Sequence, residues 1–318
     1  MRIVVALGGN ALLQRGEAPE EAVQRRHVRQ AAQALAPLAA EHQLVVCHGN
    51  GPQIGVLALE SVQDRSLSHP YPLDALGAAT QGMIGYWLAQ ELAAAGVAAP
   101  VLAVVTQTVV DAADPGFGEP TKFIGPGYDE THADRLTRTQ GWRLGRDGTH
   151  WRRVVPSPRP VRVVEEPTIR SLVDGGALVV CGGGGGVPVV ADDQGRLTGV
   201  DAVVDKDLTA ALLAVALDAD RLLLLTDVPA VMRDFGTPHA GELRRLTTAE
   251  LAGLALPAGS MRPKVEACGW FAQATGRPAA IGALGDAAAV LGGRAGTSVV
   301  PADAPLGAVR SPGGGPAR

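Results

Sequence analysis

Short apolar runs alternate with longer amphipathic stretches along most of the chain. Residues 2–7 and 44–47 are apolar on both faces, and each run leads into a glycine-rich turn. Helical periodicity follows the first turn over about 20–41 and resumes after Pro52. Strands that are apolar throughout and separated by helices are typical of a parallel sheet covered on both faces. The pattern therefore predicts an α/β fold.

The rest of the chain repeats this alternation, with one interruption. Further helices are predicted over about 74–95, 203–217 and 260–275, and further strands over 101–105, 178–181, 187–190, 221–226 and 279–282. Between residues 111 and 163 the helical periodicity fades, and Pro, Gly, Arg and aromatic residues accumulate. The alternatives for 111–163 are one long surface loop and an inserted lid subdomain. We expect the subdomain, because structureless loops of this length are uncommon inside compact domains. Residues 1–301 would then form one α/β domain that carries the insert, and 302–318, rich in Pro, Gly and Ala, a disordered tail.

Composition excludes several classes of protein. A net charge of −4 without a basic tract argues against nucleic acid as the main partner. No window approaches the roughly 18 apolar residues of a membrane span, and Met1 runs directly into the first strand without the apolar stretch of a signal peptide. The three cysteines, Cys47, Cys181 and Cys268, have no CxxC spacing, which fits a reducing compartment without disulfides or a zinc site. We expect a cytoplasmic protein with no nucleic-acid or membrane partner.

Three predicted strands end in glycine-rich turns. These turns are Gly8-Gly9-Asn10, Gly49-Asn50-Gly51 and the run Gly182 to Gly186, which includes Gly183 and Gly184. Each turn alone could be only a tight connection, but three at the carboxyl ends of strands in one sheet favour anion binding. The phosphate motif GxxxxGK[ST] is absent, and Val187 and Pro188 interrupt a GxGxxG register. Thr226-Asp227 follows another apolar strand, at a sheet edge that suits a nucleotide, although tight-turn chemistry explains it nearly as well.

Lysine is rare in this chain. Of the 28 Lys and Arg residues, only Lys122, Lys206 and Lys264 are lysine. Lysine is a compact point charge and arginine a planar fork, so the two are not interchangeable where a single phosphoryl oxygen must be met. We therefore interpret all three lysines as candidate phosphate contacts, against the alternative that they survived by chance.

Each lysine lies in a distinct segment. Lys206 opens a helix that Asp205 can cap, where it can meet a transferring phosphoryl group while Asp207 or Asp205 holds the lysine or a metal. A surface capping cluster is the alternative. Lys264 lies in the opening turns of a helix that Ser260 can cap, where it is either a phosphate contact or an exposed charge. Lys122 lies in the insert, where a mobile lid could bring its charge over a substrate.

Taken together, these segments resemble the carbamate kinases, a branch of the amino-acid kinase superfamily. The resemblance covers about residues 3 to 298 and is carried by VVALGGNAL (4–12), HGNGPQIG (48–55), TQGMIGY (80–86), PTKFIGPGY (120–128), RRVVPSPRP (152–160), CGGGGGVPVV (181–190), DKDL (205–208), LTDV (225–228) and GSMRPKVEA (259–267). It implies a three-layer αβα sandwich around an open, mainly parallel sheet of about eight strands, with residues 111–163 as a protruding subdomain.

The resemblance also implies an activity and a set of roles. The reaction is reversible phosphoryl transfer between ATP and carbamate, which gives ADP and carbamoyl phosphate. It depends on Mg²⁺ bound with the nucleotide. The resemblance also implies that the enzyme is a homodimer. By resemblance, Lys206 and Asp207 are the catalytic pair, Lys122 lies over carbamate and Lys264 faces the ATP phosphates. The turn at Gly8, Gly9 and Asn10 matches the first phosphate-binding turn, and Gly49, Asn50 and Gly51 match the second, near the acceptor. No residue of the chain is assigned as a metal ligand.

Two alternatives remain open beside this activity. One is a ligand sensor that kept the fold and lost turnover, and the other is a kinase for a different small carboxylic acid. Many relatives in the superfamily carry lysine at the position of Ala6, whereas carbamate kinases lack it. The absence of this lysine disfavours an acetylglutamate- or aspartate-kinase interpretation. Cys47, Phe123 and Arg262 depart from the usual residues of the family, and the last two lie within two residues of a candidate lysine.

Overall fold

The computed structural model describes residues 1–302, apart from 15, 252, 255 and 257–260. Nearly all of the predicted tail, from residue 303 on, lies outside the described residues, and so does Ser260, the predicted cap of the last long helix.

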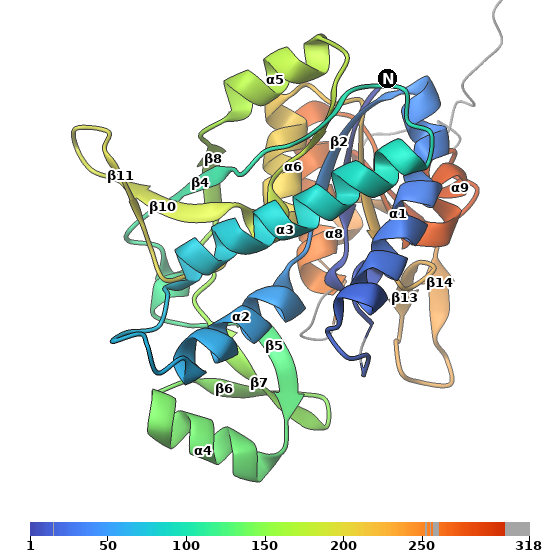
Figure 1. Cartoon of the computed structure of the whole chain (residues 1–318). Coiled ribbons are helices and arrows are strands. Elements are labelled where there is room, and N and C mark those ends of the chain that lie inside the picture. The colour runs from blue at the N-terminus through green and yellow to red at the C-terminus, as the bar shows by residue number, and fades with distance from the viewer. Residues whose placement is uncertain (15, 252, 255, 257–260, 303–318) are drawn as a thin grey trace, which may run out of the picture.

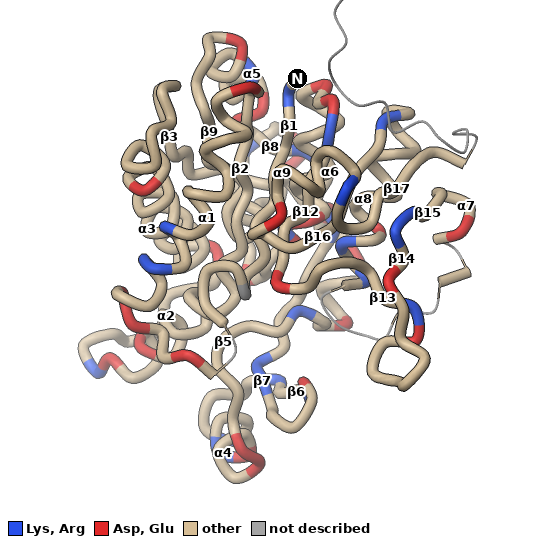
Figure 2. The backbone as a smooth tube through the Cα atoms, turned by 90° about the vertical axis from the view of Figure 1, so that its right-hand side faces the viewer, with Lys and Arg blue, Asp and Glu red and all other residues tan. Residues whose placement is uncertain are grey.

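The core of the molecule is an eight-stranded sheet in the order β15-β17-β16-β12-β1-β2-β9-β3. Its strands are β1 (Arg2–Leu7), β2 (Gln43–His48), β3 (Val101–Ala103), β9 (Leu178–Val180), β12 (Arg221–Thr226), β15 (Arg245–Thr247), β16 (Ala279–Ala283) and β17 (Thr297–Val300). The pairing of β16 with β17 is antiparallel and the other pairings in this sheet are parallel. Figure 2 shows the central strands almost free of charged residues, as strands buried on both faces should be.

Alternate residues of each strand face opposite helical layers. Val4 and Ala6 pack with α5 (Glu166–Asp174), α6 (Lys206–Ala216) and α8 (Met261–Thr275). Ile3 and Val5 pack with α1 (Glu21–Glu41), α3 (Leu73–Ala94) and α9 (Ala287–Leu291). The result is a three-layer sandwich (Figure 1). It follows directly from the two-residue period of a strand whose every side chain is apolar.

Three smaller sheets accompany the main one. The first has the order β11-β10-β4-β8 and joins β4 (Gln107–Val110), β8 (Pro160–Val163), β10 (Val187–Ala191) and β11 (Leu197–Gly199). The second is the hairpin of β13 (Val231–Arg233) and β14 (Gly241–Leu243), which leads through β15 to the short helix α7 (Thr248–Leu251). The third, which we call the lid sheet, contains β5 (Lys122–Tyr128), β7 (His150–Val155) and β6 (Leu144–Asp147).

The lid sheet and α4 (Glu130–Gln140) project from the bottom of the molecule in Figure 1. Asp129 caps α4 by accepting a hydrogen bond from the backbone N–H of His132 at 2.7 Å, and Gly141 ends the helix at φ +65°. The lid sheet lies within the predicted insert, but β8, at the end of that insert, pairs with β4. The boundaries at 111 and 163 stay a prediction.

The closest backbone contact between the lid sheet and α2 is formed by two glycines. β5 packs on α2 (Gly51–Gln63), the helix that follows the second glycine turn. A Cβ atom on Gly55 would lie 2.0 Å from the Cα atom of Gly125, so the two backbones meet directly. Gly125 has φ +72°, a conformation that favours glycine. No side chain can separate α2 from β5 at this point.

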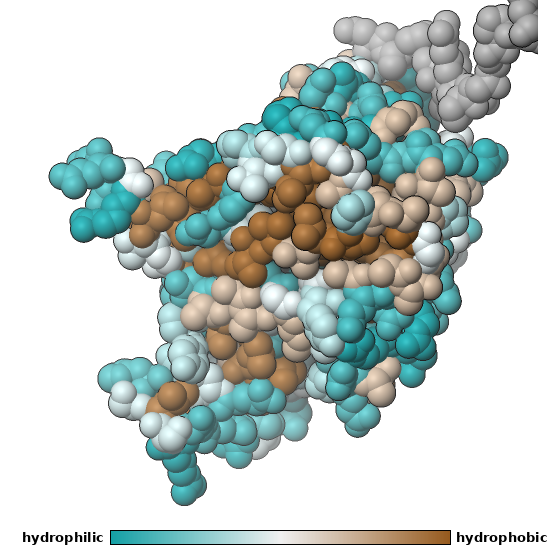
Figure 3. Space-filling view, turned by 45° about the horizontal axis from the view of Figure 1, so that its top comes forward, coloured by the Kyte–Doolittle hydropathy of each residue, from teal (hydrophilic) through white to brown (hydrophobic). Residues whose placement is uncertain are grey.

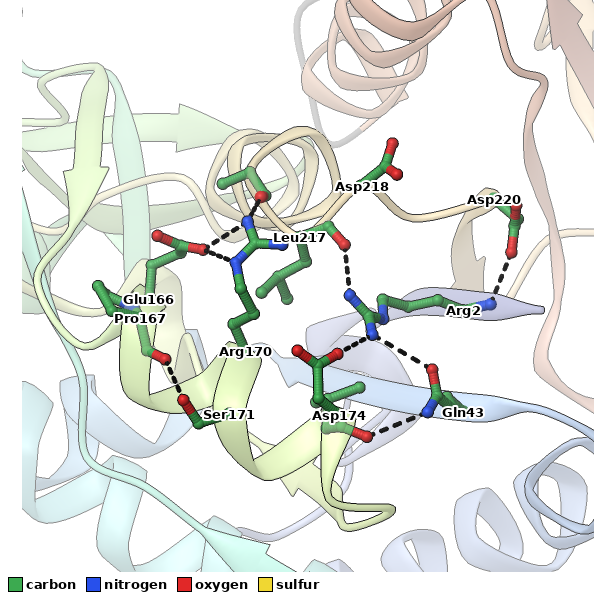
Figure 4. A network of polar contacts seen from close by, with 12 residues as sticks. Arg2, Gln43, Glu166, Pro167, Arg170, Ser171, Asp174, Leu217, Asp218 and Asp220 are labelled. Carbon is green, nitrogen blue, oxygen red and sulfur yellow. Dashed lines mark hydrogen bonds and ion pairs between the residues drawn. The ribbon is translucent and has the colours of Figure 1, made fainter.

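The amino-terminal edge of the sheet is held by Arg2 (Figure 4). Its backbone N–H donates to Asp220 Oδ2 at 2.8 Å, and its guanidinium donates to the Leu217 carbonyl at 2.8 Å and forms an ion pair with Asp174. Arg2 also lines an open hollow of about 600 Å³ together with His42 and other residues. These contacts join β1 to the carboxyl ends of α5 and α6, at the opposite end of the strands from the glycine turns.

The predicted fold class is confirmed, and the long helices and central strands lie close to their predicted ranges. The strand predicted over 187–190 is β10 and belongs to the four-stranded sheet, because the glycine run before it turns the chain away from β9. The strand β17 and the β13–β14 hairpin were missed. Among the described residues no helix is long and apolar enough to cross a membrane. The cytoplasmic location stays a prediction.

Candidate active site

The first two glycine turns touch one another at the carboxyl ends of β1 and β2. The Gly8 N–H donates to the Leu225 carbonyl of β12 at 2.8 Å, and the Gly49 N–H donates to the Leu7 carbonyl at 3.0 Å. A Cβ atom on Gly49 would lie 2.9 Å from the Gly9 nitrogen and 3.4 Å from Cε of Lys206. Glycine at position 49 therefore keeps open the space between the two turns, beside the lysine.

The third glycine turn lies against the second turn and against α6. Gly184 has φ +62°, and a Cβ atom there would lie 2.2 Å from Asn50 Nδ2. The Gly185 carbonyl accepts hydrogen bonds from Thr108 Oγ1 at 2.7 Å and from Thr209 Oγ1, on α6, at 2.9 Å. The turn is thus tied to the amino-terminal end of α6, where backbone N–H groups and the helix dipole attract anions.

Asp207 joins two buried lysines at the centre of this region. Lys206 Nζ donates to Asp207 Oδ1 at 2.6 Å, and Lys264 Nζ, from α8, donates to Asp207 Oδ2 at 2.9 Å. Lys206, Asp207 and Lys264 are 7%, 4% and 5% exposed. One carboxylate therefore holds two ammonium groups side by side, and we call these three residues the triad.

Burial and mutual attraction set the charges of the triad. Burial opposes ionisation of Asp207, but the two lysines hold the pKa of its carboxyl far below the usual range. Burial lowers the pKa of Lys206 to about 8, because Asp207 offsets only part of the desolvation cost and the Lys264 charge repels. Burial also opposes the charge of Lys264, yet Asp207 raises the pKa of this lysine above its ordinary value. Near neutral pH the triad carries a net positive charge.

The third lysine reaches the same region from the lid sheet. Lys122, the first residue of β5, forms an ion pair with Asp205 Oδ2. Asp205 is the residue that caps α6, and its Oδ1 accepts hydrogen bonds from the backbone N–H groups of Asp207 at 2.9 Å and Leu208 at 3.4 Å. Burial opposes ionisation of Asp205, but the Lys122 charge lowers the pKa of its carboxyl.

Two more groups border the site. Thr226 ends β12, and its Oγ1 donates to Asp227 Oδ1 at 2.9 Å; a Cβ atom on Gly8 would lie 3.3 Å from the same Oγ1. His48 ends β2 and is 1% exposed, with Nδ1 3.0 Å from the Gly49 carbonyl. Burial lowers the pKa of His48 to about 4, so its ring is neutral at physiological pH and Nδ1 carries the proton donated to that carbonyl.

The structure brings the predicted site residues together. The three glycine turns, the triad, Lys122 and Thr226 meet through the contacts above, and Asp227 adjoins Thr226. For Asn10 only the backbone is described, in a short 3₁₀ turn over Gly9–Ala11. Sequence reasoning considered Asp205 only as a cap or as the holder of Lys206 or a metal. It missed the pairing with Lys122, and it also missed Thr108 and Thr209 beneath the third glycine turn.

Comparison with known proteins agrees with this geometry. The model of the amino acid kinase family matches residues 1–283. A carbamate kinase from Rhizobium meliloti is 50% identical over 302 residues, which cover 94% of this chain and 93% of that protein. The structure of a carbamate kinase from Giardia lamblia bound to citric acid has a TM-score of 0.88 at 38% identity, with 94% of this chain and 98% of that one covered.

The same Giardia lamblia enzyme has been solved with AMP-PNP, an analogue of ATP, and superimposes with a TM-score of 0.83 at 38% identity over 94% of this chain and 98% of that one. The likeness thus spans the main sheet, the lid sheet and the glycine turns rather than one motif. Together with the arrangement of the triad and the three turns, it shows that the chain belongs to the amino acid kinase family and, within it, to the carbamate kinases.

Proposed function

We propose that the chain catalyses reversible phosphoryl transfer between ATP and carbamate, with Lys206, Asp207 and Lys122 as catalytic residues. The observation that carries this proposal is the triad beside the two glycine turns. Phosphoryl transfer needs little covalent help from the protein, and its rate depends on positioning and on neutralising charge at the phosphoryl oxygens. Two buried ammonium groups held by one carboxylate meet that need.

Each part of the site has a role in this proposal. The N–H groups of Gly8 and Gly49 are used within the sheet, so the remaining N–H groups of the turns at Gly8–Asn10 and Gly49–Gly51 bind phosphoryl and acceptor oxygens. Lys264 and the edge at Thr226 and Asp227 face the nucleotide. The third turn, with Gly183 and Gly184, completes the anion pocket. Lys206 donates one N–H to Asp207 and has further N–H groups for the transferring phosphoryl. Carbamate already carries an anionic oxygen, so the neutral His48 need not act as a base.

Mg²⁺ is proposed as a companion of the nucleotide. Each carboxylate oxygen of Asp207 accepts a hydrogen bond from a lysine ammonium. Among the described residues, no group of three or more His, Cys, Asp and Glu side chains could hold a metal ion. This chemistry fits an ion that is held mainly by nucleotide phosphates and water, as Mg²⁺ commonly is. When bound, Mg²⁺ would neutralise phosphate charge; the lysines would position the oxygens around it.

The predicted homodimer has a suitable surface. α3 is apolar around most of its circumference, a property of helices covered on all sides. Its solvent face carries Tyr86, 51% exposed, and the neighbouring edge strand β3 carries Leu102, 41% exposed. A hydrophobic band crosses the molecule in Figure 3. We propose that a second copy of the chain covers the face formed by α3 and β3, because an isologous contact would pair apolar surface with apolar surface.

The activity is tested by mixing the purified chain with ADP and carbamoyl phosphate, with and without Mg²⁺, and measuring ATP. We expect ATP to form only with Mg²⁺, since the triad alone does not balance the charge of two phosphorylated substrates. If ADP binds but no ATP forms, the chain is either a sensor or a kinase for another acceptor, and small carboxylic acids are then screened with ATP. If the chain phosphorylates another small carboxylic acid and not carbamate, the proposed identity of the acceptor is contradicted.

Replacement of the central lysine tests its role. Lys206→Arg keeps the charge but places a planar guanidinium in a buried position built for a compact ammonium. We expect kcat to fall by roughly 100-fold or more, with ADP binding and the far-ultraviolet circular dichroism spectrum retained. Wild-type turnover in this variant, measured by the same ATP assay, would remove Lys206 from the mechanism.

The oligomeric state tests the proposed dimer face. We expect light scattering after gel filtration to give twice the chain mass, and Leu102→Asp to give the chain mass, because it buries a charge at the interface. Phe235→Asp is the matched control: Phe235 is 66% exposed outside α3 and β3, and this variant should stay dimeric. A monomeric parent chain, or a dimeric Leu102→Asp variant, contradicts the assignment of this face.

A further inference from the structure

Asp205 divides its two carboxylate oxygens between two parts of the molecule. Oδ1 caps α6, directly before Lys206, while Oδ2 pairs with Lys122, which is 83 residues away in the sequence. The Asp205 side chain is 10% exposed and that of Lys122 31%. A partly buried ion pair of this kind is less screened by solvent than one on the surface.

The lid sheet contacts the main domain at several points, and two of them lie close together on β5, on either side of Ile124, which is buried against Ile54 of α2. Lys122 begins β5, and three residues later Gly125 meets Gly55 of α2 backbone to backbone.

The glycine contact fixes where β5 crosses α2 but supplies no directional bond. Pairing with β7, and the hydrogen bond from the Val203 N–H to the Pro156 carbonyl that follows β7, place the amino-terminal end of β5. The ion pair with Asp205 then fixes where the Lys122 ammonium points.

We infer that Asp205 is a positioning residue that latches the lid sheet to α6 and so holds the Lys122 ammonium over the acceptor side of the site. The part of this inference that concerns the acceptor rests on the proposed function; the latch itself does not. The pairing places three lysines near one helix end, with Lys122 on Asp205 and with Lys206 and Lys264 on Asp207. Loss of the Asp205 charge would release Lys122, while Lys206 and Lys264 would keep their ion pairs with Asp207.

Two substitutions separate the latch from the cap. Asn and Ser cap helices about as well as Asp, so Asp205→Asn and Asp205→Ser retain an acceptor for the N–H groups of α6. Neither offers a charge to Lys122. Asp129→Asn is the matched control, because Asp129 caps α4 inside the lid and no ion pair of its side chain occurs among the described residues. It should behave as the parent chain in every assay.

The latch is measured on the substrate-free protein through lysine reactivity. The chain contains three lysines, of which Lys206 and Lys264 are buried, so limited acetylation with acetic anhydride followed by peptide mass spectrometry reports on Lys122 against two internal references. We expect Lys122 to be acetylated about fivefold faster in Asp205→Asn and Asp205→Ser than in the parent chain or in Asp129→Asn. A change of this size is what the loss of one ion pair should cause. Lys206 and Lys264 should stay slow.

An unchanged rate at Lys122 overturns the latch. Equal acceleration at all three lysines overturns it too, because Asp205 would then stabilise the whole end of α6 rather than the lid. Neither result depends on catalysis, so a failure of the latch is distinguishable from a failure of the proposed function.

Kinetics then test the link to the acceptor. In both Asp205 variants we expect the KM for carbamoyl phosphate to rise about tenfold while the KM for ADP changes less than about twofold, because the released cation serves the acceptor side. A purely structural role would lower kcat or raise both KM values together. An unchanged KM for carbamoyl phosphate in a variant with accelerated Lys122 labelling would show that the latch exists but does not serve the acceptor, and this outcome overturns the positioning role.

Discussion

The site depends on one carboxylate. Asp207 pairs with both Lys206 and Lys264, and each of the three groups is at least nine-tenths buried. Charges taken out of water are costly unless they are paired with good geometry, and two cations without Asp207 would repel each other at close range. The carboxylate therefore fixes both ammonium groups, and with them the relative position of α6 and α8. The contact of Asp207 with Lys206 is local in the sequence, whereas its contact with Lys264 joins two helices that are distant in the sequence.

The fold supplies the remaining geometry. Parallel pairing brings the carboxyl ends of β1, β2, β9 and β12 to one edge of the sheet, so the glycine turns that follow β1, β2 and β9 converge there with Thr226 at the end of β12. The layer that contains α6 and α8 brings the triad to the same edge, with Lys264 arriving 57 residues after Asp207. The lid sheet adds Lys122 from across the site. In the proposed site, anions would therefore lie between backbone N–H groups on one side and ammonium groups on the other.

Much of this arrangement could be predicted from the sequence because the signals are local. Apolar runs that end in glycine predict buried strands and their turns, and lysine stands out where arginine is the usual cation. The direction of β17 and the membership of β10 in a second sheet could not be predicted, since both depend on pairing partners distant in sequence. The same holds for Asp205, whose local pattern reveals a helix cap but not the lysine that its second oxygen holds.

The most direct test of the central role of Asp207 is the free energy of unfolding in a double-mutant cycle with Lys264→Met. Asp207→Asn leaves two buried cations without their counter-charge and should cost about 3–5 kcal/mol. In the parent chain Lys264→Met should lower the free energy of unfolding, because Asp207 loses one partner. In the Asp207→Asn background the same substitution should raise the free energy of unfolding, because it removes a charge that repels Lys206. A central role of Asp207 predicts this change of sign. Destabilisation by Lys264→Met of the same size in both backgrounds would show that the two residues contribute independently and would contradict it.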